Sequence, residues 1–152
     1  MARYVVGKVD DIADGDHIVV EINGKSVGIF HLEGEFYGLL NYCPHRGGPM
    51  CSGQVVSWLD SDRPGDLRLD SSRKLLECPW HGWEFDIKTG QSYFDPRRTR
   101  IRPFPVAVEA GEEVAEALAA GEDSDTHLVP GPYTAETIPV SVEDDYVVVM
   151  MR

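Results

Sequence analysis

Two short segments, each carrying one cysteine and one histidine, constrain this chain more than any other feature of its sequence. In the first, His45 follows Cys43 by two residues, and in the second, His81 follows Cys78 by three. Thiolates and imidazoles are both ligands of iron and of zinc. If the four side chains share one site, the fold must bring together two loops that are 32 residues apart, counted between His45 and Cys78.

The residues beside these four candidate ligands favour an iron–sulfur cluster over a zinc ion. Gly47, Gly48 and Gly82 leave the backbone free to turn its N–H groups toward bridging sulfides. Pro44 and Pro79, each directly after a cysteine, stiffen the two loops. A zinc ion held by the same two cysteines and two histidines is the alternative, because zinc accepts this ligand set.

Together the two segments resemble the signature of the Rieske [2Fe–2S] family, C-x-H-R-G followed by C-P-x-H-G, and they match it at every ligand position. The resemblance implies one Rieske-type [2Fe–2S] cluster whose inner iron is bound by Cys43 and Cys78. His45 and His81 would bind the outer, solvent-facing iron. A shell of neighbouring residues around the ligands is also implied, namely Arg46, Gly47, Gly48, Trp80, Gly82 and Trp83.

Four positions near the ligands place the expected cluster at the low end of the Rieske potential range. Clusters with two neutral imidazoles span about −150 to +300 mV, against about −400 mV for plant-type ferredoxins. Respiratory members carry a disulfide between the loops, whereas Gly48 and Trp80 stand at those positions here. They also carry Ser and Tyr hydroxyls that donate to sulfur, where this chain has Trp83 and Phe85. Fewer donors lower the potential, so we expect a low-potential centre with a midpoint below about +100 mV.

Length and composition indicate one cytoplasmic domain. A chain of 152 residues can bury a hydrophobic core without disulfides or structural metal ions, and its sequence has no signal peptide or bilayer-spanning run. Three cysteines are too few for a disulfide framework, which fits a reducing compartment. The net charge of −12 argues against nucleic acid and anionic membranes as partners. Most of the acidity is C-terminal, since residues 103–152 hold eleven acidic side chains and one basic.

The strand pattern predicts an all-β chain, because short apolar or alternating runs are separated by turn signals at intervals of about eight to twelve residues. The resemblance implies the Rieske (ISP-like) fold, an antiparallel β-sandwich base with a small cluster-binding subdomain made of two loops, about residues 42–95, in a single domain spanning 1–152. Strands are expected over residues 4–9, 17–22, 26–32, 36–40, 54–59, 74–77, 83–86, 100–108, 136–142 and 146–151.

Two stretches exceed what the family pattern explains and are interpreted as insertions, at about 60–73 and 109–135. The first is polar and rich in turn residues, which indicates a solvent-exposed extended hairpin or, alternatively, a finger that docks a partner. Within the second, residues 111–121 are helix-prone and end on a glycine. Residues 136–142 and 146–151 are expected to form a closing hairpin.

Several other side chains are given structural roles. Three isolated histidines are expected at the surface or in strands, namely His17, His31 and His127. Cys51 is interpreted as a small buried hydrophobe or an idle thiol. Trp80 and Trp83 are expected to shield the cluster, and Arg46 to anchor its loop to a carboxylate. A basic ridge of Arg98, Arg100 and Arg102 is a solvated strand face or a docking surface.

These features predict a soluble, low-potential one-electron carrier between a reductase and a terminal oxygenase or related redox enzyme. The chain has no second pair of histidines at helical spacing for a mononuclear iron site, so we do not expect it to be an enzyme alone. Specificity would lie in the surface around His45 and His81. Two alternatives are a small subunit or accessory component of a larger oxidoreductase, and a metal- or redox-dependent binding module.

Overall fold

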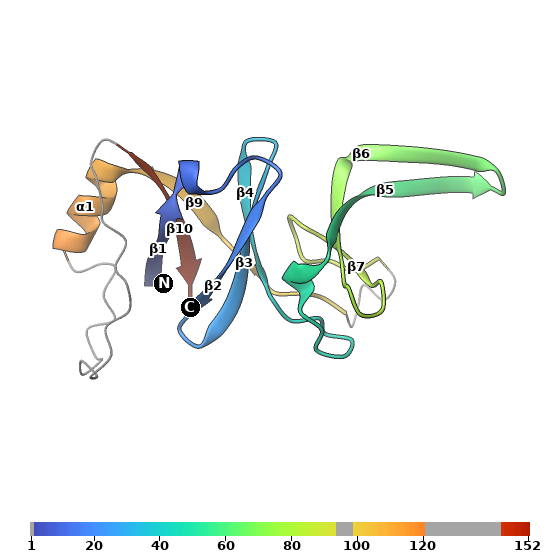
Figure 1. The fold of residues 1–152 in the computed structure, drawn as a ribbon, viewed down its shortest axis with the longest axis horizontal. Coiled ribbons are helices and arrows are strands. Elements are labelled where there is room, and N and C mark those ends of the chain that lie inside the picture. The colour runs from blue at the N-terminus through green and yellow to red at the C-terminus, as the bar shows by residue number, and fades with distance from the viewer. Residues whose placement is uncertain (1, 94–98, 121–143) are drawn as a thin grey trace. The chain divides into compact units, whose positions relative to one another are not determined.

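The structure is a computed structural model that describes residues 2–93, 99–120 and 144–152 (Figure 1). Within these residues it contains strands, two 3₁₀ helices at Val9–Asp11 and Met50–Ser52, and the helix α1 at Gly111–Ala119. The strands are β1 Ala2–Lys8, β2 His17–Ile22, β3 Lys25–Leu32, β4 Glu35–Leu40, β5 Gln54–Arg63, β6 Asp66–Glu77, β7 Glu84–Asp86, β8 Pro103–Phe104, β9 Val106–Ala110 and β10 Asp145–Met151. β1 pairs with β10, β10 with β9, β5 with β6 and β6 with β7, each antiparallel, and the predicted all-β class is confirmed.

The chain divides into two compact units. The first comprises Met1–Ile18, Phe30–Gly38 and Phe104–Arg152, and the second comprises Val19–Ile29 and Leu39–Pro103. All four candidate ligands belong to the second unit. No helix in the described part of the chain is long and apolar enough to cross a membrane.

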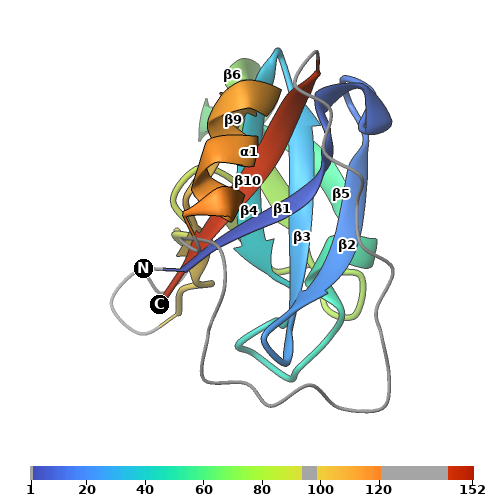
Figure 2. The same cartoon turned by 90° about the vertical axis from the view of Figure 1, so that its left-hand side faces the viewer.

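The first unit is built around β10, which lies between β1 and β9 in a three-stranded sheet. Residues 146–149 of β10 are fully buried, so this strand is covered on both faces. On one face lies α1, whose Val114 packs against Tyr146 and Val148 (Figure 2). The helix predicted over 111–121 is thereby confirmed as far as Ala119. The expected hairpin partner of β10, residues 136–142, lies outside the described residues, as do residues 121–135 of the second predicted insertion.

Proline interrupts the strand that was predicted over residues 100–108. This stretch contains two shorter strands instead, β8 before Pro105 and β9 after it, and the two strands belong to different sheets. Proline has no N–H to donate to a ladder, which explains the break. The Pro105 carbonyl still accepts a hydrogen bond from the Met150 N–H at 2.9 Å.

A four-stranded sheet has the spatial order β2-β3-β4-β8. Tight turns at Asn23-Gly24 and Glu33-Gly34 lie in the gaps between the strands predicted over 17–22, 26–32 and 36–40, and both residues of each turn have positive φ. This is the backbone of a type I′ turn, which matches the twist of the flanking strands. The Asp14 carboxylate also accepts the N–H groups of Glu33 and Gly34, at 2.9 and 3.0 Å.

In the second unit, β5, β6 and β7 form a three-stranded sheet from which β5 and β6 continue as a long two-stranded arm (Figure 1). The polar stretch 60–73 is therefore part of an extended hairpin, as predicted, and its interpretation as a finger that docks a partner stays a prediction. On one face of the arm, the Arg68 guanidinium forms ion pairs with three carboxylates, those of Asp60, Asp62 and Asp66. All of these side chains are solvent-accessible, so the pairs add little stability.

Candidate metal centre

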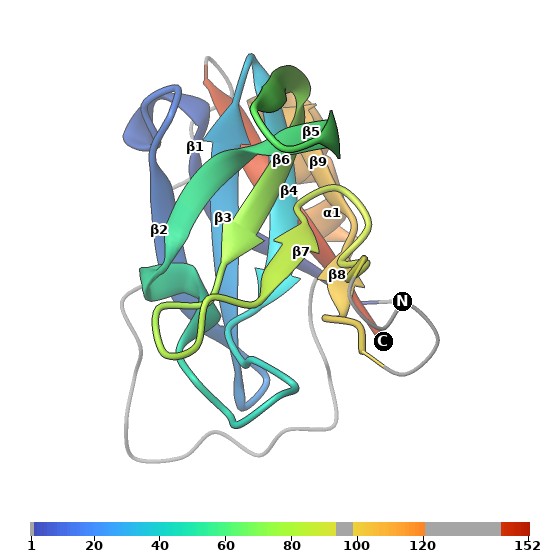
Figure 3. The same cartoon turned by 90° about the vertical axis from the view of Figure 1, so that its right-hand side faces the viewer.

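Strand register brings the two predicted ligand loops to one end of the β5–β6–β7 sheet (Figure 3). The first loop leads from the end of β4 into Gln54, the first residue of β5. Gln54 pairs with Glu77, the last residue of β6, and Glu77 pairs with Glu84, the first residue of β7. The second loop, 78–83, connects these last two strands. Both loops therefore begin or end on one row of paired residues, which fixes their mutual approach.

The two loops repeat one backbone hydrogen-bond pattern although their cysteine–histidine spacings differ. In the first, the Cys43 N–H donates to the Gly48 carbonyl at 2.8 Å, and the Gly47 N–H donates to the Cys43 carbonyl at 2.7 Å. In the second, the Cys78 N–H donates to the Trp83 carbonyl at 2.8 Å, and the Gly82 N–H donates to the Cys78 carbonyl at 3.0 Å. Each cysteine thus begins a tight turn closed by a glycine four residues later.

Glycine at these two positions has a conformational reason. Gly47 has φ +79° and Gly82 has φ +72°, in the left-handed region that L side chains rarely adopt. These glycines were expected to leave the backbone free to turn its N–H groups toward bridging sulfides. The N–H groups of Gly47 and Gly82 themselves donate to cysteine carbonyls, so donors to a sulfide would be other N–H groups of the loops.

Both candidate thiols are buried and free. Cys43 is 1% exposed and Cys78 is 2% exposed. Burial raises the pKa of the Cys43 thiol, the adjacent Cys78 thiol raises it further, and the backbone N–H groups of His45 and Arg46 act in the opposite direction. A thiol kept protonated by burial releases its proton when a metal ion binds the sulfur.

The two imidazoles lie together nearer the surface. The ring centroids of His45 and His81 are 4.9 Å apart, with an interplanar angle of 86°. Trp83 stacks on His45 at 4.3 Å and 13°, as the predicted shielding role requires. His45 is half-buried and His81 is exposed. Desolvation lowers the pKa of His45, with smaller contributions from His81 and Arg46, which favours the neutral imidazole that a metal binds.

The donor set fits a two-iron cluster. The Nδ1 atom of His45 is buried and has no hydrogen-bond partner among the described residues, which is costly unless something outside the chain binds it. Two buried thiols and two neighbouring imidazoles form two pairs. In the described part of the chain, no three Cys, His, Asp or Glu side chains gather as ligands of one ion. One pair of cysteines and one pair of histidines suit a cluster of two irons, each with two protein ligands. A single zinc ion would need all four side chains around one point.

Gly48 has a packing role that the sequence did not reveal. A Cβ on this residue would lie 3.1 Å from the Cys78 sulfur and 3.0 Å from the Trp80 ring. A side chain at this position would therefore require the Cys78 sulfur or the Trp80 ring to move by a few tenths of an ångström. Trp80 itself is 57% exposed and covers the site less than expected. Arg46 is exposed and forms no ion pair with a carboxylate among the described residues, so its expected anchoring role is not observed.

The other histidines have structural contacts in the first unit. His17 stacks on Phe30 with centroids 4.9 Å apart, and His31 stacks on Phe36 at 4.2 Å. His31 Nδ1 also lies 2.6 Å from the Ile12 carbonyl oxygen. These contacts confirm the structural interpretation of both residues, and His127 lies outside the described residues.

Cys51 is fully buried, as predicted, and burial raises the pKa of its thiol to about 12. Its N–H donates to the Asn41 side-chain oxygen at 2.8 Å. The Asn41 N–H in turn donates to the Ser26 carbonyl at 2.9 Å. Asn41 therefore ties the first ligand loop to β3, a role that no sequence pattern indicated because it depends on partners distant in the chain.

Of the predicted basic ridge, Arg98 lies outside the described residues. The Arg100 guanidinium donates to the Thr89 carbonyl through Nε at 3.3 Å and Nη2 at 3.2 Å. Arg100 thus holds a turn of its own chain, while Arg102 is exposed.

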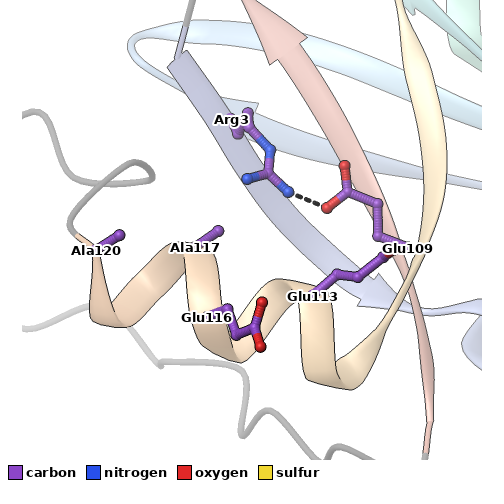
Figure 4. A pocket seen from close by; sticks show the side chains of 6 residues that line it. All are labelled: Arg3, Glu109, Glu113, Glu116, Ala117 and Ala120. Carbon is purple, nitrogen blue, oxygen red and sulfur yellow. Dashed lines mark hydrogen bonds and ion pairs between the residues drawn. The ribbon is translucent and has the colours of Figure 1, made fainter.

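A separate hollow of about 500 Å³ lies in the first unit (Figure 4). Its charged lining consists of Arg3 and three glutamates, of which Glu109 pairs with Arg3. The other two, Glu113 and Glu116, project from α1. None of the predicted ligands lines this hollow, so it is not part of the candidate metal centre.

Comparisons with known proteins identify a family. A family model of the Rieske [2Fe–2S] domain matches residues 2–105. The chain is 32% identical over 101 residues to the ferredoxin component of the naphthalene 1,2-dioxygenase/salicylate 5-hydroxylase systems of a Ralstonia species, covering 66% of this chain and 82% of that protein.

Two solved structures share the fold. The ferredoxin of carbazole 1,9a-dioxygenase from Nocardioides aromaticivorans IC177 matches with a TM-score of 0.56 and 20% identity, over 72% of this chain and 91% of that one. The ferredoxin of Sphingomonas yanoikuyae B1 matches with a TM-score of 0.52 and 23% identity, over 70% of this chain and 90% of that one. These similarities confirm the predicted fold.

Proposed function

Because the chain belongs to the Rieske [2Fe–2S] domain family, we propose that it is a one-electron carrier that links a reductase to a terminal oxygenase or a related redox enzyme. Members of this family bind one [2Fe–2S] cluster, which accepts and releases a single electron when bound. The observation that carries the proposal is the pairing of two buried thiols with two imidazoles, one of which has a buried, unpartnered nitrogen.

Cys43 and Cys78 would hold the inner iron, and His45 and His81 the outer iron. The burial gradient supports this assignment, since both sulfurs are enclosed while His81 is exposed. Enclosed thiolates keep water from the sulfur ligands, and an exposed imidazole gives an electron a short route to a docked protein. His45 would bind through Nδ1, the atom that lacks a partner in the described residues.

The potential is proposed to lie in the lower part of the Rieske range of about −150 to +300 mV. Trp83 and Phe85 stand where hydroxyl donors would raise the potential, and the Phe85 ring is fully buried. The N–H groups of Gly47 and Gly82 are taken by backbone carbonyls. Fewer donors to sulfur leave the more negative, reduced cluster less stabilised.

The relative from Ralstonia supports an oxygenase system as the destination of the electron, since its name describes a ferredoxin component of dioxygenase and hydroxylase systems. We extend that role to this chain as a proposal. We also propose a cytoplasmic location, because all three cysteines are free thiols, as is usual for proteins of reducing compartments.

One observation favours the alternative of a stably assembled subunit. Leu59, Leu67 and Leu69 are 56%, 67% and 68% exposed. They share one face of the β5–β6 arm, because Leu59 pairs directly with Leu69, and Leu67 is two residues from Leu69. Apolar clusters of this kind mark contact surfaces. Stoichiometric co-purification with a larger enzyme, lost in a triple Leu→Ser variant, would favour the subunit.

The carrier role is tested by counting electrons. Anaerobically purified protein is titrated with dithionite and re-oxidised over several cycles while its visible spectrum is recorded. We expect one electron per two irons, with the spectrum fully recovered in each cycle. A colourless protein that binds one zinc ion, or a spectrum that is lost on the first reduction, would overturn the proposal.

A further inference from the structure

An aromatic cleft of about 280 Å³ lies beside the second ligand loop. It is lined by Gly82 and Trp83 of that loop, by Glu84, by Trp58 of β5 and by Tyr93. The Trp58 and Tyr93 rings meet edge to face, with centroids 5.3 Å apart and an angle of 69°. Because Trp83 also stacks on His45, an occupant of this cleft would be one side chain away from a proposed iron ligand.

Carboxylates gather on the side of the sheet that faces the cleft. Glu84 lines the cleft directly and lies opposite Glu77 in the β6–β7 ladder. Neither glutamate has an ion-pair or hydrogen-bond partner among the described residues. Like charges placed directly opposite each other destabilise a sheet. Accordingly, burial and then Glu77 raise the pKa of Glu84. The pair is a local excess of negative charge that a cation would relieve.

Among the described residues, no cationic side chain pairs with Glu84 or Glu77, although the Arg73 guanidinium already lies over two of the aromatic rings. The Asp86 carboxylate lies on the same face of the β6–β7 ladder as the two glutamates, and it accepts the N–H groups of Lys88 and Thr89. Lys74 points to the opposite face, where its ammonium group donates to the Ser57 hydroxyl at 3.3 Å. The Arg73 guanidinium is 5.6 Å from the Trp58 ring centroid and 5.7 Å from that of Tyr93, yet Arg73 does not line the cleft.

We propose that this cleft receives a lysine or arginine side chain of the redox partner and so docks that partner against Trp83. Aromatic rings attract a cation through their negative faces, and a carboxylate at the rim adds direct attraction. The inference rests on the proposed carrier function, which supplies the partner. Electron-transfer contacts are small and short-lived, so one anchored side chain can set their rate. A second copy of this chain is a poor occupant, because each copy carries a net charge of −12.

The test measures electron transfer from the reduced, cluster-loaded protein to small probes in a stopped-flow spectrometer. Hexaammineruthenium(III) is the cationic probe, and it takes one electron from the protein to become ruthenium(II). Hexacyanoferrate(III) is the anionic probe. We expect Glu84→Gln to slow oxidation by the cationic probe about two- to fivefold and not to slow oxidation by the anionic one. Glu113→Gln on α1 removes the same charge from the other hollow and should leave the cationic rate within experimental error.

A competition experiment tests the aromatic walls. At equal ionic strength, tetramethylammonium chloride should slow oxidation by hexaammineruthenium(III) more than sodium chloride does, because the organic cation occupies the cleft. Trp58→Leu and Tyr93→Leu should each abolish this difference. Iron, sulfide and midpoint are measured for every variant, so that a lost cluster is not mistaken for a lost docking site.

Two results would contradict the inference. Equal effects of Glu84→Gln and Glu113→Gln would mean that only net charge matters. Equal effects of the two salts would mean that the rings do not select cations. If the cluster loads and cycles one electron normally while either result is found, the cleft proposal fails and the carrier function stands. If no cluster loads in the wild type, the carrier function itself fails.

Discussion

At the residue scale, the two imidazoles are the side chains that set the charge of the site. Replacing His81 by cysteine adds a third thiolate, so the oxidised cluster becomes more negative and harder to reduce. We expect the midpoint of His81→Cys to fall by about 100 mV or more, toward the value of about −400 mV for all-cysteine clusters. A redox titration followed by EPR measures this. An unchanged midpoint in a variant with full iron and sulfide content would exclude His81 as a ligand.

Gly48 is the residue where the two loops approach most closely. Gly48→Ala places a methyl group 3.1 Å from the Cys78 sulfur, and overpacking of this kind costs about 1–3 kcal/mol. We expect a lower yield of bound iron and a lower thermal midpoint. Gly7→Ala is the control, because its methyl group would meet only Asp11, whose solvent-exposed carboxylate lies 3.3 Å away. Equal behaviour of both variants would disprove the packing role of Gly48.

Cys51 links stability to alkaline pH. Its thiol has an ordinary pKa of 9.0, raised to about 12 by burial. Above about pH 9 the unfolded chain loses this proton while the folded chain keeps it, so the folded state binds more protons and stability falls as pH rises through the window from about 9 to about 12. Between about pH 8 and about pH 10.5, this thiol should lower the free energy of unfolding of the wild type by about 2 kcal/mol. Cys51→Ala should not show this loss. Urea unfolding at both pH values measures it, and parallel losses in the two proteins would count against the shift.

The four ligand candidates could be predicted from sequence because cysteine and histidine at these spacings have few other uses. Their environment could not be predicted as fully. Trp83 was expected to shield the site, and its ring does stack on His45. The glycines were expected to free backbone N–H groups for bridging sulfides, but which N–H groups the turns would use could not be predicted, and the turns use those of Gly47 and Gly82. The acceptor of these bonds, a cysteine carbonyl, is placed only when the turn forms.

At the scale of elements, the β5–β6 arm is separable from the metal centre. Register at the loop end depends on the pairs from Gln54–Glu77 to Ser57–Lys74, whereas the arm lies beyond Trp58 and Asp70. Replacing residues 60–68 by an Asn-Gly turn, which joins the paired residues Leu59 and Leu69, should therefore leave iron content and midpoint unchanged, as a redox titration can establish. Leu76→Ala, in the fully buried base of the same strand, should cost about 2–5 kcal/mol and reduce bound iron. Loss of the cluster in the shortened protein would show that the arm supports the loops.

Turns and the helix were easier to predict than strand ends. Asn23-Gly24 marks a tight hairpin by its own chemistry, and α1 is predicted by helix-forming residues. Strand prediction stopped at Leu59 because the polar residues beyond it lack the apolar alternation of a buried strand. The arm persists as strand through backbone pairing between two exposed segments, which has no apolar signature. Trp58 and Tyr93 meet only because the fold joins them, so the cleft has no sequence signal.

At the scale of the whole molecule, the sheet order is the part that sequence reasoning could not reach. β10 lies between β1 and β9, and this arrangement pairs residues from opposite ends of the chain. Short apolar strands such as these carry little information about which neighbour they choose, since many registers bury similar side chains. The strand pattern supplied the all-β class and the family resemblance the Rieske fold, whereas the structure supplies the pairing that places both ligand loops together.

The central claim is that two histidines and two cysteines hold one [2Fe–2S] cluster, and pulsed EPR of the dithionite-reduced protein tests it most directly. We predict a signal whose average g value is below that of all-cysteine clusters, with strong hyperfine coupling to two nitrogen nuclei. Iron and sulfide should be present at about two of each per chain. A reduced cluster without coupled nitrogen, or a colourless protein containing one zinc ion, would contradict the account.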